Sequence, residues 1–207
     1  QKLADNLGNS EDRRWLEFRM AETLARAEAM SQNADDSTSR AAETALRKYV
    51  EKDARVDRIW AEAHEALGDI SWFGRNRYNW HQGWPNYEKA LDFWAGSTNL
   101  AYATERYWSI IHKASQPPRA QPFYYYGQFG NYLPLPVLEN ALKIARDENE
   151  RARANFMIAM TLRNGGSWEQ RFRIPHHFEE SLQLKKDTNW NDDALYYFGG
   201  WMSYQGT

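Results

Sequence analysis

Apolar residues recur along this chain at the spacing of an amphipathic helix. The clearest run is Val56, Ile59, Trp60, Ala63, Leu67 and Ile70. These six positions fall on one helical face, and Asp53 before them is a candidate N-cap. We therefore predict a helix over about 54–73. The same periodicity predicts further helices near 11–31, 40–52, 85–95, 98–114, 136–147, 150–163, 175–186 and 191–205.

No segment has the pattern of a stable β-strand. Residues 123–126 are aromatic and therefore β-prone, but Pro122 and Gly127 flank them directly. We interpret 116–134 as an ordered aromatic loop between helices. The sequence therefore predicts an all-α fold.

Part of the helical pattern repeats. Segments 154–166 and 194–206 align without gaps, at an offset of 40 residues. Each carries a small residue, Ala159 or Gly199, with an apolar residue three positions later and a Gly seven positions later. Gly68 is the corresponding small residue of the helix predicted over 54–73. A small side chain lets a second helix approach closely.

A second motif follows these helices. It reads aromatic or apolar, acidic, polar, small, Leu, and it occurs as Tyr87-Glu-Lys-Ala-Leu, Leu138-Glu-Asn-Ala-Leu and Phe178-Glu-Glu-Ser-Leu. Its small residues are Ala90, Ala141 and Ser181. The two motifs alternate along the chain, as the first and second helices of successive hairpins would.

This alternation resembles the tetratricopeptide (TPR) repeat. The resemblance implies a TPR-like superhelix of antiparallel helical hairpins, an α-solenoid, over about residues 54–206. Its close-packing residues would be Gly68, Ala90, Ala141, Ala159, Ser181 and Gly199. The chain departs from the usual repeat through two aromatic-rich inserted loops, near 74–85 and 116–134. We therefore divide it into an N-terminal helical hairpin, 1–52, and TPR-like repeats with inserts, 53–207.

A narrower stretch is similar to another family. Residues 84–97 and 103–111 resemble the helical region of some large bacterial alpha-2-macroglobulin-like surface proteins. This implies a segment of a larger exported protein, periplasmic or extracellular; without the resemblance, a cytoplasmic location is expected. The start at Gln1 and the unpartnered last helix also suggest a fragment, so we expect the apolar face of that helix to be exposed or covered by further sequence.

Composition and charge exclude several classes of function. The net charge is −2 and the basic residues are scattered, which argues against nucleic-acid binding. No apolar stretch approaches the roughly 18–20 residues of a membrane span. The absence of cysteine excludes disulfides, thiolate zinc sites and thiol catalysis.

The remaining residues give no sign of catalysis or of a cofactor. The five histidines show no zinc-binding motif, and we expect them at surface or capping positions. His176 and His177 follow Pro175 at a helix start, where at most one ring faces inward. No G-x-S-x-G nucleophile elbow is present. We predict no catalytic residue, no metal and no cofactor.

Aromatic residues are the most distinctive feature, since 17 of the 31 lie between Trp72 and Tyr132. A partner-binding surface would comprise Tyr78, Trp80, Trp84, Tyr124, Tyr125, Tyr126 and Tyr132, with Arg75 and Arg77. Aromatic and arginine side chains are enriched where proteins bind proteins. The alternative is that most of these rings fill gaps between the two inserts.

The sequence therefore predicts a non-catalytic protein-interaction or scaffold module within a larger protein or complex. Its partner would be a protein, a peptide or other domains of the same chain. The alternative function is carbohydrate binding or glycan cleavage, in which Trp80 and Trp84 stack on sugars beside Asp69 and Asp92.

Overall fold

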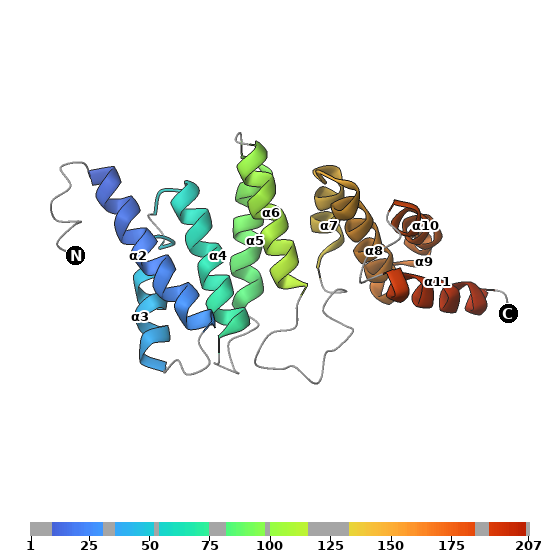
Figure 1. Cartoon of the computed structure of the whole chain (residues 1–207), viewed down its shortest axis with the longest axis horizontal. Coiled ribbons are helices and arrows are strands. Elements are labelled where there is room, and N and C mark those ends of the chain that lie inside the picture. The colour runs from blue at the N-terminus through green and yellow to red at the C-terminus, as the bar shows by residue number, and fades with distance from the viewer. Residues whose placement is uncertain are drawn as a thin grey trace. The chain divides into compact units, whose positions relative to one another are not determined.

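The computed structural model describes residues 10–30, 36–51, 54–74, 82–97, 100–115, 133–184 and 191–205. All regular structure in these ranges is helical, with no strand (Figure 1). The predicted all-α class is confirmed for this part of the chain. None of its helices combines the length and the apolar character that crossing a lipid bilayer requires.

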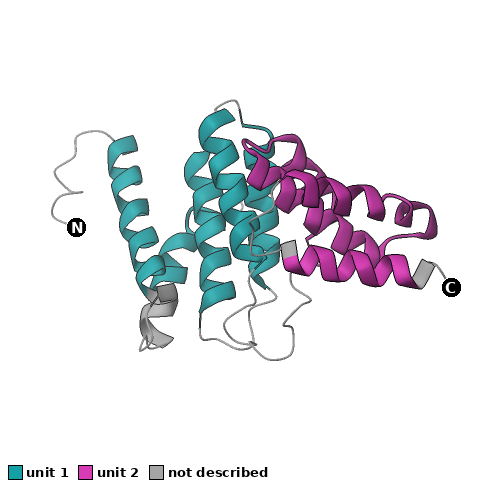
Figure 2. Cartoon of the chain, turned by 45° about the vertical axis from the view of Figure 1, so that its right-hand side comes forward, with its two compact units in different colours: residues 1–125 teal, residues 126–207 magenta. Residues whose placement is uncertain are grey.

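The chain forms two compact units, residues 1–125 and residues 126–207 (Figure 2). The boundary expected between residues 52 and 53 stays a prediction. The inserts near 74–85 and 116–134 fall mainly outside the described residues, although α5 already begins at Gly83.

Unit 1 contains the helices α2 (Ser10–Met30), α3 (Asp36–Arg47), α4 (Arg58–Phe73), α5 (Gly83–Ala95) and α6 (Leu100–Ala114). Each helix packs against the next along the chain. In addition, α4 packs against α2 and α6. The apolar core between α2, α3 and α4 includes Phe18, Leu46 and Leu67. Because α4 has neighbours on several sides, every residue from Ala61 to Gly68 is buried.

Unit 2 contains α7 (Leu135–Lys143), α8 (Glu148–Gly165), α9 (Trp168–Arg171), α10 (Ile174–Leu184) and α11 (Asn191–Gln205). The long helix α8 packs against α7, α9 and α10, and α11 packs against α10. The short helix α9 was not predicted. It begins at a capping box, in which Ser167 and Gln170 exchange side-chain and backbone hydrogen bonds.

Two helix ends differ from the prediction, and capping residues explain both differences. The helix expected from residue 54 begins at Arg58, because the Asp57 carboxylate accepts a hydrogen bond from the Trp60 backbone N–H at 3.0 Å. Asp53, the expected cap, lies outside the described residues. The helix expected to reach 147 ends at Lys143, and Asp147 caps α8 instead, accepting from the Glu150 N–H at 2.8 Å.

Five of the six small residues predicted at helix contacts are buried. A Cβ atom added to Gly68 would lie 2.5 Å from the ring of Tyr87, so glycine is what lets α5 approach α4 here. Four further predicted packing residues are fully buried: Ala90, Ala141, Ala159 and Ser181.

Gly199 requires a correction. It lies within α11, it is exposed, and a Cβ added there would meet no described atom within 4 Å. The close packing expected at Gly199 is therefore absent among the described residues, because none of their helices covers that face. Neither Gly199 nor Gly200 ends the helix.

The helix pairs α4/α5 and α8/α10 each contain a histidine–asparagine contact at the equivalent place. The histidine lies on the first helix of one pair and on the second helix of the other. In the first pair, Nδ1 of His64 lies 2.9 Å from Oδ1 of Asn86. In the second, Nδ1 of His177 lies 2.8 Å from Oδ1 of Asn155. Both contacts join residues 22 positions apart, and an offset of 91 residues relates the two pairs. The same offset relates Gly68 to Ala159 and Tyr87 to Phe178.

Candidate functional site

Of the nine residues predicted to bind a partner, the structure describes only Trp84. It is half-buried in the first turn of α5. The others lie outside the described residues: Arg75, Arg77, Tyr78, Trp80, Tyr124, Tyr125, Tyr126 and Tyr132. The aromatic surface therefore stays a prediction.

The carboxylates proposed for glycan chemistry have other environments. Asp69 accepts a hydrogen bond from the Tyr87 hydroxyl at 2.7 Å and forms an ion pair with Lys113 at 2.7 Å. Asp92 is exposed on α5. Asp69 is thus engaged by two side chains, and Asp92 lies on another helix, α5.

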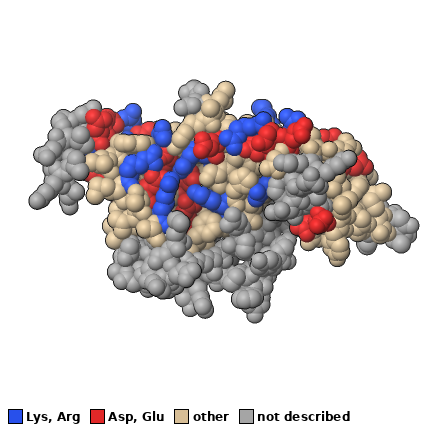
Figure 3. All heavy atoms as spheres, viewed as in Figure 1, with Lys and Arg blue, Asp and Glu red and all other residues tan. Residues whose placement is uncertain are grey.

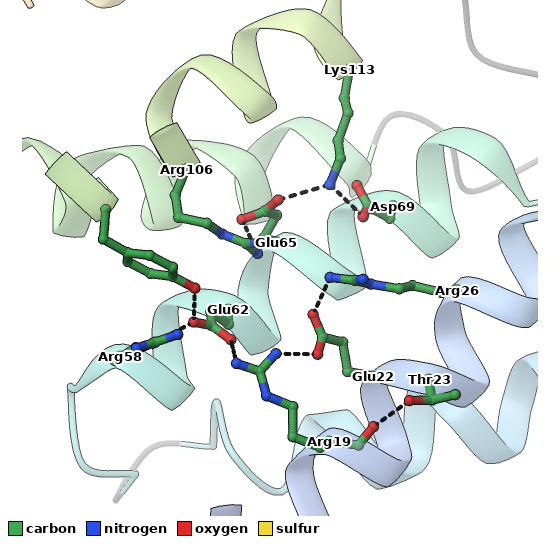
Figure 4. Close-up of polar contacts among 11 residues, drawn as sticks. Arg19, Glu22, Thr23, Arg26, Arg58, Glu62, Glu65, Asp69, Arg106 and Lys113 are labelled. Carbon is green, nitrogen blue, oxygen red and sulfur yellow. Dashed lines mark hydrogen bonds and ion pairs between the residues drawn. The ribbon is translucent and has the colours of Figure 1, made fainter. Parts of the chain in front are cut away.

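A different site emerges from three helices of unit 1, and we call it the charged face. It comprises Arg19, Glu22 and Arg26 from α2, Arg58, Glu62, Glu65 and Asp69 from α4, and Tyr102, Arg106 and Lys113 from α6 (Figure 4). On each helix these residues are spaced three, four or seven positions apart. That spacing brings them to one side of their helix.

Glu62 is the centre of one half of the charged face, and its side chain is fully buried. It pairs with Arg58 on its own helix at 2.6 Å and with Arg19 of α2 at 3.0 Å. The Tyr102 hydroxyl of α6 donates a further hydrogen bond to it. One carboxylate therefore joins α2, α4 and α6.

Glu65 is the centre of the other half and is almost fully buried. It pairs with Arg106 at 2.6 Å and with Lys113 at 2.8 Å. Lys113 also binds Asp69, so α6 is held to α4 at two successive helical turns. Buried charges are tolerated only when they are paired in this way.

Burial and pairing act in opposite directions on the acid–base properties of this half. Burial raises the pKa of the Glu65 carboxyl, while Lys113 and Arg106 act against that rise. Burial alone would lower the pKa of Lys113, but Asp69 and Glu65 outweigh it and raise that pKa. Lys113 therefore stays a cation, held beside two acidic side chains.

The charged face is layered, with acids beneath bases. The side chains of Glu22, Glu62 and Glu65 are buried, whereas those of Arg26 and Arg58 are 60% and 47% exposed. Arg58 also lies over the ring of Tyr102, 4.0 Å from its centroid. Figure 3 shows basic and acidic side chains gathered on this side of unit 1. The groups that meet solvent are mainly guanidinium groups.

One histidine was placed wrongly by the sequence. His64 is buried and bridges two helices, whereas a surface or capping position was expected. His177 is also buried and bridges two helices. His176 is exposed, so one ring of the His176–His177 pair faces inward, as expected. Within the ranges that the structure describes, no group of three or more acidic residues and histidines could hold a metal ion.

Sequence reasoning missed the charged face because acidic and basic residues in a helix normally indicate solvent exposure. The only signal was the spacing of Arg58, Glu62, Glu65 and Asp69 at 0, 4, 7 and 11 positions, which places four charged residues on one side of a helix. Their partners on α2 and α6 are more than 30 residues away along the chain, so the spacing does not indicate which residues pair.

Comparison of this chain with protein-family models, with curated proteins and with solved structures found no match.

Proposed function

We propose that this chain is a non-catalytic protein-interaction or scaffold module, built from TPR-like helix pairs, whose charged face binds an acidic segment of a protein partner. The observation that carries the proposal is that the exposed Arg26 of α2 and Arg58 of α4 lie over the buried acids Glu22 and Glu62. The proposal includes a role within a larger protein or complex, which is supported by the resemblances in the sequence.

The layering supports binding of an anionic partner. Arg26 and Arg58 are 60% and 47% exposed and pair with the buried Glu22 and Glu62. Arg19, Arg106 and Lys113 lie deeper and pair with the same carboxylates or with Glu65 and Asp69. The carboxylates fix the direction of each guanidinium, so less side-chain entropy is lost when a partner binds. An arginine has five N–H donors and keeps unused ones after a single ion pair.

The same pairing supports a role without catalysis. A general acid or base needs a proton-transfer group that is free to reach a substrate. Glu62 and Glu65 are instead buried, and each is paired with two cations. Their positions are those of structural anions that hold helices and orient bases.

A matched pair of variants tests this proposal. Arg26 and Arg47 have side chains 60% and 57% exposed, and each pairs with a glutamate four residues earlier on its own helix. Only Arg26 belongs to the charged face. The purified chain, Arg26→Glu and Arg47→Glu are used as baits in a lysate of the source organism, with chemical crosslinking and mass spectrometry to locate contacts.

We expect a partner that is captured by the unchanged chain and by Arg47→Glu, and whose crosslinks fall on α2, α4 and α6. Capture by Arg26→Glu should fall about tenfold, since charge reversal within an interface costs more than a kilocalorie per mole. Equal capture by both variants, or crosslinks that avoid these helices, would contradict the proposal.

A further inference from the structure

The outer face of α11 in unit 2 carries three positions that no described helix covers. Leu195, Gly199 and Met202 are four and three residues apart, which places them on one side of the helix. Leu195 and Met202 are 58% and 55% exposed. The space around Gly199 is open.

The equivalent face of α8 is covered. An offset of 40 residues relates the three positions to Asn155, Ala159 and Leu162, all of which are buried. Asn155 contacts His177 of α10. Helix α10 therefore covers the face of α8 that corresponds to the uncovered face of α11.

The corresponding face of α4 is covered in the same manner. His64 contacts Asn86 of α5, and the ring of Tyr87 lies against Gly68, which is the counterpart of Gly199. In both covered pairs, the helix that packs there presents a polar residue and then an aromatic one, Asn86-Tyr87 or His177-Phe178. Two copies of the face thus show what kind of helix covers it.

The uncovered face of α11 borders a groove made of two adjoining hollows. A hollow of about 750 Å³ is lined by Leu195, Tyr196, Gly199 and Gly200, among others. An adjoining hollow of about 230 Å³ is lined by Trp168, Phe172 and Met202, among others. Trp168 and Phe172 are largely exposed, and their rings lie 5.6 Å apart. An exposed apolar surface of this kind marks a binding site.

The charges at this groove are basic. Arg163 lies over the ring of Tyr197, 4.9 Å from its centroid, and Nε of Arg171 donates to the Gly166 carbonyl at 3.2 Å. Among the residues that the structure describes, neither arginine has a carboxylate partner. The motif of the covering helices has an acidic residue directly after its aromatic one, Glu88 or Glu179, so an acidic helix would complement the groove.

We propose that the face of α11 formed by Leu195, Gly199 and Met202 binds an amphipathic helix that is not part of residues 1–207. The pattern of that helix is apolar, aromatic, acidic, any residue, small, Leu. Its aromatic ring covers Gly199 as Tyr87 covers Gly68. Its first residue is apolar because Leu195 replaces the His or Asn of the covered copies. This surface is separate from the charged face, so the two proposals can fail independently.

The probe is a synthetic peptide with the sequence of residues 174–184 and the change His177→Leu. A hydrocarbon staple replaces His176 and Glu180, because an isolated helix of this length is marginal in water. Binding to the whole chain is measured by fluorescence anisotropy. The chain variants are Gly199→Leu, which fills the site, and Gly96→Leu, a control at an exposed glycine of unit 1. Circular dichroism verifies that each variant is folded.

We expect saturable binding to the unchanged chain and to Gly96→Leu. Binding should weaken about tenfold or more with Gly199→Leu, and equally when Phe178 of the peptide is replaced by Ala, since the aromatic residue is the central contact. Absence of binding, or binding that Gly199→Leu leaves intact, overturns the proposal. So does a sedimentation result in which the chain dimerises and Gly199→Leu makes it monomeric, because a second copy then covers the face.

Discussion

His177 and Asn155 join α10 to α8 through a contact of 2.8 Å between Nδ1 and Oδ1. The Asn155 amide N–H₂ donates to the carbonyl of Arg151, four residues earlier, which turns its oxygen toward the histidine. Asn86 is held in the same way by the carbonyl of Gln82 while it faces His64. In both pairs the histidine must therefore donate from Nδ1, although histidine and asparagine have exchanged helices.

This exchange predicts that the two residue types can be swapped in unit 2. Asn155→His and His177→Asn alone should each destabilise the chain by about 1–3 kcal/mol, since each leaves a buried polar group without its partner. The double variant restores one His and one Asn and should return to within about 1 kcal/mol of the original. Urea unfolding followed by circular dichroism measures all four chains. If the losses simply add, the two residues are not partners.

Acid should weaken the fold through His177. Burial, followed by the charges of Arg173 and His176, lowers the pKa of His177 to about 4. The unfolded chain binds this proton near pH 6.5, so stability is complete above that pH and declines as the pH falls toward 4. The loss between pH 6.5 and 4.5 should be about 2 kcal/mol or less, since solvent partly screens the ring. Burial also lowers the pKa of His64, and the effect there has the same sign.

The measurement is urea unfolding between pH 7 and pH 4.5 for the original chain and for His177→Gln. The variant should show the smaller decline, because it no longer has this proton-binding group. Equal declines in the two chains would assign the acid sensitivity to other residues.

The sequence predicted the positions of most helices because their apolar faces are periodic. It also predicted the close approach at Gly68, since an aromatic-acid-x-small-Leu motif follows that helix. It could not place Glu62 and Glu65, because their burial arises from α2 and α6 packing on either side of α4. The shared His–Asn contact was likewise hidden, because the exchange of residue types removes any identity between the two pairs.

Two glycines should respond oppositely to the same substitution. Gly68→Ala places a methyl group against the ring of Tyr87 and should destabilise the chain by about 1–3 kcal/mol. Gly199→Ala meets no described atom and lies in the interior of α11, so it should stabilise that helix by about 0.5–1 kcal/mol. Thermal unfolding of both variants tests this difference. Similar effects at the two positions would mean that α5 does not approach α4 at Gly68.

Replacing the buried Glu62 of the charged face should destabilise the chain more than replacing the exposed Glu43. Glu62→Gln removes the carboxylate that joins Arg19 to Arg58 and should cost about 1–3 kcal/mol, since both arginines still reach solvent and Arg19 keeps its pairing with Glu22. Glu43→Gln breaks an exposed pair with Arg47 and should cost under about 1 kcal/mol. The comparison uses urea unfolding at neutral pH, and equal costs would show that Glu62 is not a buried link between helices.

The repeated helix pair, closed by a buried His–Asn hydrogen bond, is the feature on which this account depends most. Long-range ¹H–¹⁵N NMR of the histidine rings tests it directly, because the spectra separate the two neutral tautomers from the cation. At pH 7 we predict that His64 and His177 are both neutral and protonated at Nδ1. Protonation of His64 and His177 at Nε2, or titration of both near pH 6.5, would contradict the repeated contact.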